Sequence, residues 1–134
     1  MFPLDTRIIV ADDMEAIRNL LVSHLENLGF KNIQVAADGS KTIDLLTKGV
    51  NTQQPIGLIL CDWNMPVKTG MDVLLFVRSH QFYAKLPFIM VTQESEREQI
   101  AQAVLQGVSH YIMKPFTAAT VKERLESVFQ RISG

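Results

Sequence analysis

Five short apolar segments alternate along the chain with stretches of helical periodicity. The segments are RIIVA (7–11), NIQVA (32–36), GLILC (57–61), PFIMV (87–91) and HYIM (110–113). Four of them are nearly continuous in hydrophobicity, which is typical of strands covered on both faces. Strands that alternate with helices favour a parallel sheet with right-handed crossovers and helices on both of its faces. The sequence therefore predicts an α/β fold.

Helical periodicity fills the stretches between the apolar segments. It predicts helices over residues 14–28, 39–48, 70–79, 96–106 and 118–132. In the last of these stretches, apolar residues recur on one helix face, namely Val121, Leu125, Val128, Phe129 and Ile132.

The ends of these predicted helices carry the usual start and stop signals. Three helices are expected to end at a glycine in the left-handed conformation: Gly29, Gly49 and Gly107. The predicted N-terminal caps are Asp38, Thr117, and Ser95 in a capping box with Glu98. The polar stretch NTQQP (51–55) predicts a loop, which is either a tolerated surface insertion or a partner contact.

Length, charge and cysteine content narrow the class of protein. At 134 residues the chain is long enough for one domain with a single core. Its formal net charge of −1 indicates no general attraction to nucleic acid or to an anionic membrane. The apolar runs are too short to span a bilayer, and the start, MFPLDTR, lacks the features of a signal peptide. The one cysteine, Cys61, cannot form an internal disulfide, which fits a reducing compartment. We therefore expect a cytoplasmic protein.

Polar side chains follow the carboxyl ends of four of the five predicted strands. Asp12 and Asp13 follow the first strand, Asp62 the third, Thr92 the fourth and Lys114 the fifth. In open α/β sheets, ligands bind outside these ends, where the strand order reverses. Carboxylates that converge there repel one another, and a hard divalent cation such as Mg²⁺ removes that conflict. Lys114 and Thr92 could then meet an anion. The pattern predicts a carboxylate that accepts a phosphoryl group.

Four motifs in this order carry a specific resemblance over essentially the whole chain. They are ADDM (11–14), DWNMP (62–66), VTQE (91–94) and KPFTAAT (114–120). The chain resembles response-regulator receiver domains, and among them the CheY-like regulators of chemotaxis. The resemblance implies a flavodoxin-like sheet with strand order 2-1-3-4-5. It also implies a single receiver domain over residues 1–134, without an output domain, that is monomeric and is a signalling module rather than an enzyme.

The resemblance also implies the chemistry of the acidic residues. Asp62 matches the phosphoacceptor, which takes a phosphoryl group from a histidine kinase in a Mg²⁺-dependent reaction. Asp13, Asp62 and the backbone carbonyl of Asn64 match the direct Mg²⁺ ligands, while Asp12 acts largely through a bound water. Asn64 and Glu94 stand where they could tune self-dephosphorylation.

Three further residues match the family's switch. Lys114 matches the lysine that contacts the phosphoryl group, and Thr92 matches the hydroxyl that moves toward it. Tyr111 matches the aromatic residue that turns inward when this hydroxyl moves. The family also implies a cis peptide bond between Lys114 and Pro115.

The resemblance implies protein partners for the switch. The surface formed by the fourth helix, fifth strand and fifth helix is expected to dock a CheA-like histidine kinase and a flagellar switch component. Arg97, Lys122 and Arg124 form either a basic strip on this surface or an ordinary solvated face. Control of type IV pili and a role as a phosphate sink remain as alternative outputs.

Some residues depart from the family pattern or have a simpler interpretation. Thr69 stands where an aspartate is common, and Gln93 follows Thr92 where a small residue is usual, so access to the phosphate could be narrower. Trp63 is either a pocket-edge aromatic or a packing residue. We expect Cys61 to be buried in a strand. The three histidines are expected to be surface or hydrogen-bonded residues, namely His24, His80 and His110.

Two other classes of protein share this type of sheet or this use of an aspartate. A Mg²⁺-dependent aspartyl-phosphate phosphatase would usually carry a second aspartate two residues after the nucleophile, but Asn64 stands there. An FMN-binding flavodoxin would need an uncharged phosphate loop after the first strand, but ADDME places negative charge at that point. Both classes are therefore less favoured than a receiver.

Overall fold

Strands and helices alternate along the part of the chain that the structure, a computed structural model, describes. That part comprises residues 1–93 and 97–133. The elements are β1 (Arg7–Ala11), α1 (Glu15–Asn27), β2 (Asn32–Ala36), α2 (Gly39–Asn51), β3 (Leu58–Asp62), α3 (Gly70–Ser79), β4 (Phe88–Gln93), α4 (Arg97–Leu105), β5 (His110–Lys114) and α5 (Ala118–Ser133). The predicted element types and order are therefore confirmed. None of these helices is long and apolar enough to span a bilayer.

The strands form one parallel sheet in the order β2-β1-β3-β4-β5. This confirms the expected α/β fold and strand order. Strand β1 pairs with β2 on one side and with β3 on the other, so the direction of winding reverses between β1 and β3. This reversal creates the crevice in which ligands of open α/β sheets bind.

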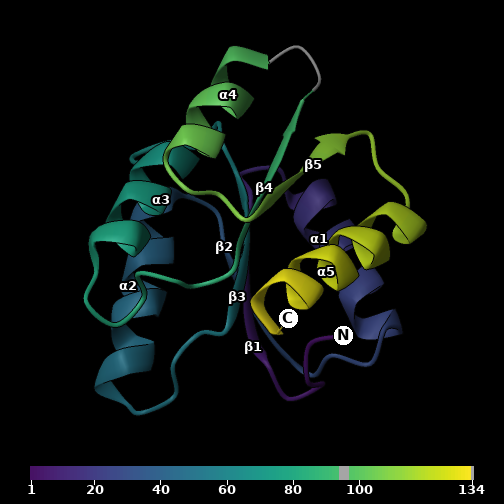
Figure 1. Cartoon of the computed structure of the whole chain (residues 1–134), viewed down its shortest axis with the longest axis horizontal. Coiled ribbons are helices and arrows are strands. Elements are labelled where there is room, and N and C mark those ends of the chain that lie inside the picture. Colours follow the sequence, from purple (N-terminus) through teal and green to yellow (C-terminus); the bar gives the residue numbers. More distant parts are fainter. Residues whose placement is uncertain (94–96, 134) are drawn as a thin grey trace.

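Helices cover both faces of the sheet, and each face has its own apolar core. Helices α2, α3 and α4 lie on one face, and α1 and α5 lie on the other (Figure 1). The first core includes Leu46 and Val77, and the second includes Leu25 and Leu125. The central strands are buried on both sides, which explains their nearly continuous hydrophobicity.

Most of the predicted helix ends are confirmed by backbone geometry and side-chain caps. Gly29 and Gly107 have φ angles of 103° and 92°, in the left-handed region. The carboxylate of Asp38 accepts a hydrogen bond from the backbone of α2, and Thr117 accepts one from the backbone of α5. The predicted capping box of Ser95 with Glu98 involves a residue that lies outside the described part of the chain.

The predicted end of α2 at Gly49 is wrong. The helix continues to Asn51, and the left-handed turn falls on Gln53, with a φ of 60°. Gly49 is buried inside the helix, where a Cβ would lie 2.9 Å from the carbonyl oxygen of Gln54 and 3.1 Å from the hydroxyl of Tyr83. Close packing requires glycine at position 49, and in the sequence this glycine resembles a helix stop signal. The predicted loop 51–55 is correspondingly shorter.

Candidate functional site

The candidate site lies at the carboxyl edge of the sheet, where β1 and β3 are neighbours. Asp12 directly follows β1, and Asp62 is the last residue of β3 rather than the residue after it. Lys114 likewise ends β5, and Thr92 is the penultimate residue of β4. Parallel strands therefore bring these residues, which are far apart in the sequence, to one edge of the sheet.

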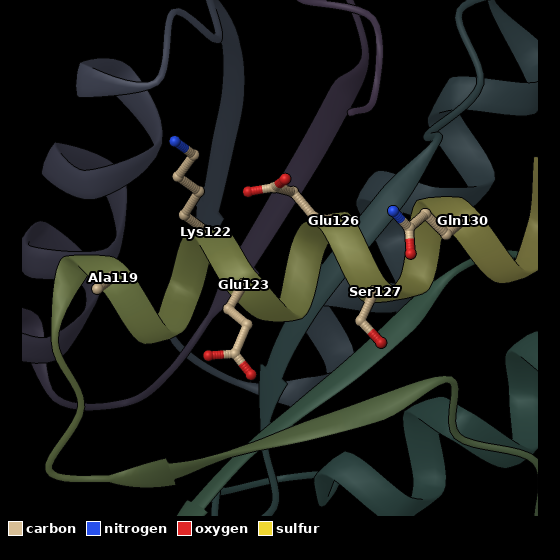
Figure 2. A pocket seen from close by; sticks show the side chains of 6 residues that line it. All are labelled: Ala119, Lys122, Glu123, Glu126, Ser127 and Gln130. Atoms are coloured by element: carbon tan, nitrogen blue, oxygen red, sulfur yellow. The ribbon is translucent and has the colours of Figure 1, made fainter.

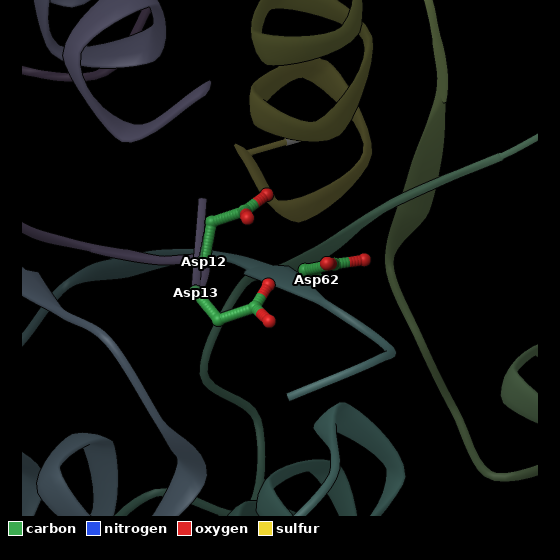
Figure 3. Close-up of side chains that lie close together, drawn as sticks. All are labelled: Asp12, Asp13 and Asp62. Atoms are coloured by element: carbon green, nitrogen blue, oxygen red, sulfur yellow. The ribbon is translucent and has the colours of Figure 1, made fainter. Parts of the chain in front are cut away.

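Three carboxylates meet at this edge. Asp12, Asp13 and Asp62 each offer one oxygen, and these oxygens lie within 4.8 Å of one another. Figure 3 shows Asp12 and Asp13 extending from the end of β1 beside Asp62 at the end of β3. Asp12 and Asp62 are buried, whereas Asp13 is exposed. Three hard oxygen donors with one solvent-exposed side suit a divalent cation such as Mg²⁺, which keeps several waters when it binds.

Lys114 is the cation within this cluster. Its Nζ donates a hydrogen bond to Asp12 Oδ2 at 2.9 Å and lies 3.3 Å from Asp62 Oδ2. Burial alone would lower the pKa of Lys114, but the hydrogen bond to Asp12 and the charges of both carboxylates raise it above 10.5. Lys114 is therefore held as an ammonium ion between two carboxylates.

Asp62 is held in an unfavourable setting for a charged carboxylate. Burial raises its pKa from 3.8 to about 6, with a further contribution from Asp12. The charge of Lys114 and a backbone hydrogen bond from Asn64 oppose this rise but do not cancel it. One ammonium group thus offsets three carboxylates only in part, and additional positive charge at the site would stabilise ionised Asp62.

Asp12 is fixed by hydrogen bonds on every side. Its Oδ1 accepts from the backbone of Met14 at 2.9 Å, and its Oδ2 accepts from Lys114. Its backbone N–H donates to Ala36 at 3.1 Å, and its carbonyl accepts from Arg18 Nη1 at 2.8 Å. Both carboxylate oxygens are therefore already engaged by protein donors. Asp13 is the acidic neighbour that remains accessible to a ligand.

Arg18 is a residue that sequence reasoning did not single out. It lies early in α1, and its guanidinium ties this helix to the carbonyl at the end of β1. A basic residue six positions after Asp12, one turn into the following helix, was the available signal. It was weak, because many helices carry a basic residue there without such a contact.

The segment after Asp62 returns tightly to the sheet before α3 begins. The N–H of Gly70 donates to the carbonyl of Trp63 at 2.8 Å, and a Cβ on Gly70 would collide with the backbone of Asp62. Thr69 and Asp72 form a complete capping box at the start of α3. Thr69 thus has a clear structural role, although the family pattern favours an aspartate there.

The other residues assigned to the switch lie close to this edge or on the neighbouring strand. Thr92 is buried at the end of β4, and Tyr111 is half-buried in β5. The peptide bond between Lys114 and Pro115 is cis, as the resemblance implies. Gln93 is exposed. Glu94, expected to tune dephosphorylation, lies outside the described residues.

Burial and local contacts also help to interpret the tryptophan, the cysteine and the histidines. Trp63 is only 8% exposed and belongs to the core under α2 and α3, which favours packing over a pocket-edge role. Cys61 is buried, as predicted. The Nδ1 atoms of His80 and His110 accept backbone hydrogen bonds, and the ring of His24 packs edge-on against Phe116.

The surface expected to dock partners carries charges of both signs. Figure 2 shows Lys122 and Glu126 projecting from one side of α5, and Glu123 and Ser127 projecting from the other, along a shallow groove. Arg124 pairs with Glu123 at 2.9 Å and donates to the carbonyl of Tyr111 at 3.2 Å. The contacts therefore favour a mixed solvated face over a basic strip.

Comparison with known proteins assigns the chain to a family. Residues 8–126 match the family model described as the response regulator receiver domain, so the chain belongs to this family.

Its relatives include named chemotaxis proteins. The chain is 40% identical over 126 residues to chemotaxis protein CheY-3 of Vibrio cholerae, covering 94% of this chain and 93% of the relative. It is 38% identical over 128 residues to chemotaxis protein CheY of Pseudomonas aeruginosa, covering 96% and 99%.

Solved structures show the same fold. Chemotaxis response regulator CheY4 of Vibrio cholerae superimposes with a TM-score of 0.78 and 27% identity, covering 92% of this chain and 98% of that one. A CheX–CheY–BeF₃–Mg²⁺ complex from Borrelia burgdorferi gives a TM-score of 0.79 and 25% identity, covering 92% and 89%. The chain is thus a CheY-like receiver by sequence and by fold.

Proposed function

We propose that the chain is a response regulator of chemotaxis that accepts a phosphoryl group on Asp62 from the phosphohistidine of a histidine kinase. The observation that carries this proposal is the cluster of Asp12, Asp13 and Asp62, with Lys114 in contact with two of the three carboxylates. The chemotaxis names of its relatives support the pathway. The domain would act in the cytoplasm through protein contacts.

Mg²⁺ fits the donor set of this site. Asp13, Asp62 and the backbone carbonyl of Asn64 would bind it directly, and Asp12 would act through a water, since both of its oxygens already have protein donors. Bound Mg²⁺ would supply positive charge to the phosphoryl oxygens. The CheX–CheY–BeF₃–Mg²⁺ complex from Borrelia burgdorferi supports Mg²⁺ as the cation.

The chain's own residues would then carry out the transfer. A carboxylate oxygen of Asp62 forms a bond to phosphorus, while the bond from phosphorus to the donor imidazole nitrogen breaks and the imidazole takes up a proton from solvent. Lys114, 3.3 Å from Asp62, exchanges its contact with the carboxylate for one with the phosphoryl group. Thr92 donates a hydrogen bond from its hydroxyl to the same group.

The output would be a change in protein binding rather than catalytic turnover. Contacts of Thr92 and Lys114 with the phosphoryl group bias two existing conformations, and Tyr111 turns inward in one of them. The surface of α4, β5 and α5 would then bind a flagellar switch component. Hydrolysis, tuned by Asn64 and Glu94, resets the domain.

Beryllofluoride with Mg²⁺ tests this switch directly, because it mimics the phosphoryl group on Asp62. NMR signals around Thr92 and Tyr111 are expected to shift in the native chain and to stay unchanged in Asp62→Asn. Unchanged spectra of the native chain would contradict the proposal. A flagellar switch peptide that binds no better after phosphorylation would redirect the output to pili or to a phosphate sink.

A further inference from the structure

Helix α4 has few apolar contacts to hold it in place. Ala103 is its one fully buried residue, and Val104 and Leu105 are 56% and 83% exposed. Burial of apolar area is the main force that fixes a surface helix on a sheet. The position of α4 must therefore depend strongly on other contacts.

The carboxyl end of α4 has a strong set of such contacts. Gly107, in the left-handed conformation, donates its N–H to Val104 at 3.1 Å, and Val108 donates to Ala103 at 3.0 Å. These two bonds form a Schellman motif, which closes the helix. Val108 also packs against the core below α3 and α4. This end of the helix is thereby anchored to the sheet.

Arg78, in the last turn of α3, reinforces the same end. Its Nε donates to the carbonyl of Gly107 at 2.8 Å. Its Nη1 donates to the carbonyl of Leu86 at 2.7 Å and lies 3.4 Å from that of Ala84. One guanidinium thus joins α3, the approach to β4 and the end of α4, which are neighbours in Figure 1.

The electrostatic setting of Arg78 suits this role. The negative ends of two helix dipoles, those of α3 and α4, lie at its guanidinium. The three carbonyls replace the water that its half-buried side chain has lost, and the burial itself lowers the pKa of Arg78. Its rigid fork of donors can hold carbonyls from two segments together, which a lysine ammonium does less well.

We infer that Arg78 is a positioning residue for the docking surface of α4, because it fixes the carboxyl end of that helix as a pivot. A change at the switch then rotates the amino-terminal part of α4 about Gly107 instead of shifting the whole helix. The role of α4 in docking rests on the proposed function, whereas the pivot itself does not.

Hydrogen exchange of the metal-free, unphosphorylated chain tests the pivot. In Arg78→Met, amides of residues 102–108 are expected to exchange about ten- to a hundredfold faster, because a hydrogen bond to a charged group is lost. Arg78→Lys should give a smaller increase. Tyr83→Phe is the matched control, since it removes bonds to Leu46 and Ile56 and should accelerate exchange there instead.

Either of two results would overturn the inference. One is that residues 102–108 of Arg78→Met exchange at the same rates as in the native chain. The other is an equal acceleration of exchange in every helix, which would mean only global destabilisation. If Arg78→Met does not fold, Arg78→Lys takes its place: unchanged exchange at residues 102–108 in that variant would overturn the inference.

Beryllofluoride with Mg²⁺ separates this inference from the proposed function. If both hold, chemical shift changes in native α4 decline toward Gly107, and in Arg78→Lys they extend through it. If the same changes occur in both proteins, the domain switches but Arg78 is not the pivot. If no change occurs in either protein, the proposed function fails while the exchange experiment still decides on Arg78.

Discussion

Replacement of Asp62 by asparagine is expected to stabilise the metal-free protein, although it removes the proposed phosphoacceptor. Burial and Asp12 raise the pKa of Asp62 from 3.8 to about 6, so its ionised form is less favourable in the folded state than in the unfolded state. This difference corresponds to about 3 kcal/mol near pH 7.5, at about 1.4 kcal/mol per pKa unit. Asparagine keeps the size of the side chain without the charge. Because neighbouring groups relax, we expect a gain of about 1–3 kcal/mol.

The gain must depend on pH with a definite sign. Between about pH 4 and 6, folded Asp62 holds a proton that the unfolded chain has released, so native stability falls as pH rises through this window. Near pH 4.5 the advantage of Asp62→Asn should therefore shrink to about 1 kcal/mol or less. Comparing the two proteins at each pH cancels the titration of all other groups.

Urea unfolding followed by far-UV circular dichroism measures this effect. Asp44→Asn, which removes an exposed carboxylate on α2, is the matched control and should change stability little. Excess Mg²⁺ should reduce the advantage of Asp62→Asn, because it offsets the charge in the native protein only. The reasoning would be refuted if Asp62→Asn were no more stable than the native protein near pH 7.5, or if its advantage were equal at both pH values.

Three further changes test other parts of the structure by urea unfolding. Val67 is a β-branched residue that is 78% exposed and has a φ of 70°, in the left-handed region. Val67→Asn should therefore stabilise the protein by about 1 kcal/mol, and a loss of stability would contradict this. Tyr83→Phe should cost about 1–3 kcal/mol, because the buried hydroxyl donates to Leu46 and accepts from Ile56; an unchanged midpoint would speak against these bonds. Mg²⁺ at a hundred times its dissociation constant should stabilise the native chain by about 2.7 kcal/mol. It should stabilise Asp13→Asn far less, and equal gains in both proteins would exclude Asp13 as a ligand.

The fold could be predicted from local patterns because its sheet is buried on both faces. Nearly continuous apolar segments and the helical stretches between them predicted each element. The errors arose where tertiary packing decides the local conformation. Gly49 is required by the close approach of Gln54 and Tyr83, which no local pattern reveals. Strand β3 includes Asp62 because its backbone pairs with Val91 of β4.

The acidic cluster could be predicted because parallel strands bring their carboxyl ends to one edge. The contacts that orient it could not, since they join residues distant in sequence or depend on side-chain direction. Arg18 binds the Asp12 carbonyl, and Arg78 reaches Gly107 across 29 positions. The sequence alone allows two interpretations of Trp63, because a residue beside a site can point into the pocket or into the core.

We propose that Asp62 becomes a phosphoacceptor once a divalent cation offsets the crowded carboxylates. The most direct measurement is a titration with Mg²⁺ followed by acetyl phosphate, read by the fluorescence of Trp63 and by intact mass. We expect quenching at both steps and the mass gain of one phosphoryl group in the native chain. Asp62→Asn should lack the second quenching step and the mass gain. A native chain that gains no phosphoryl group with Mg²⁺ present, or gains it equally in Asp62→Asn, would contradict the account.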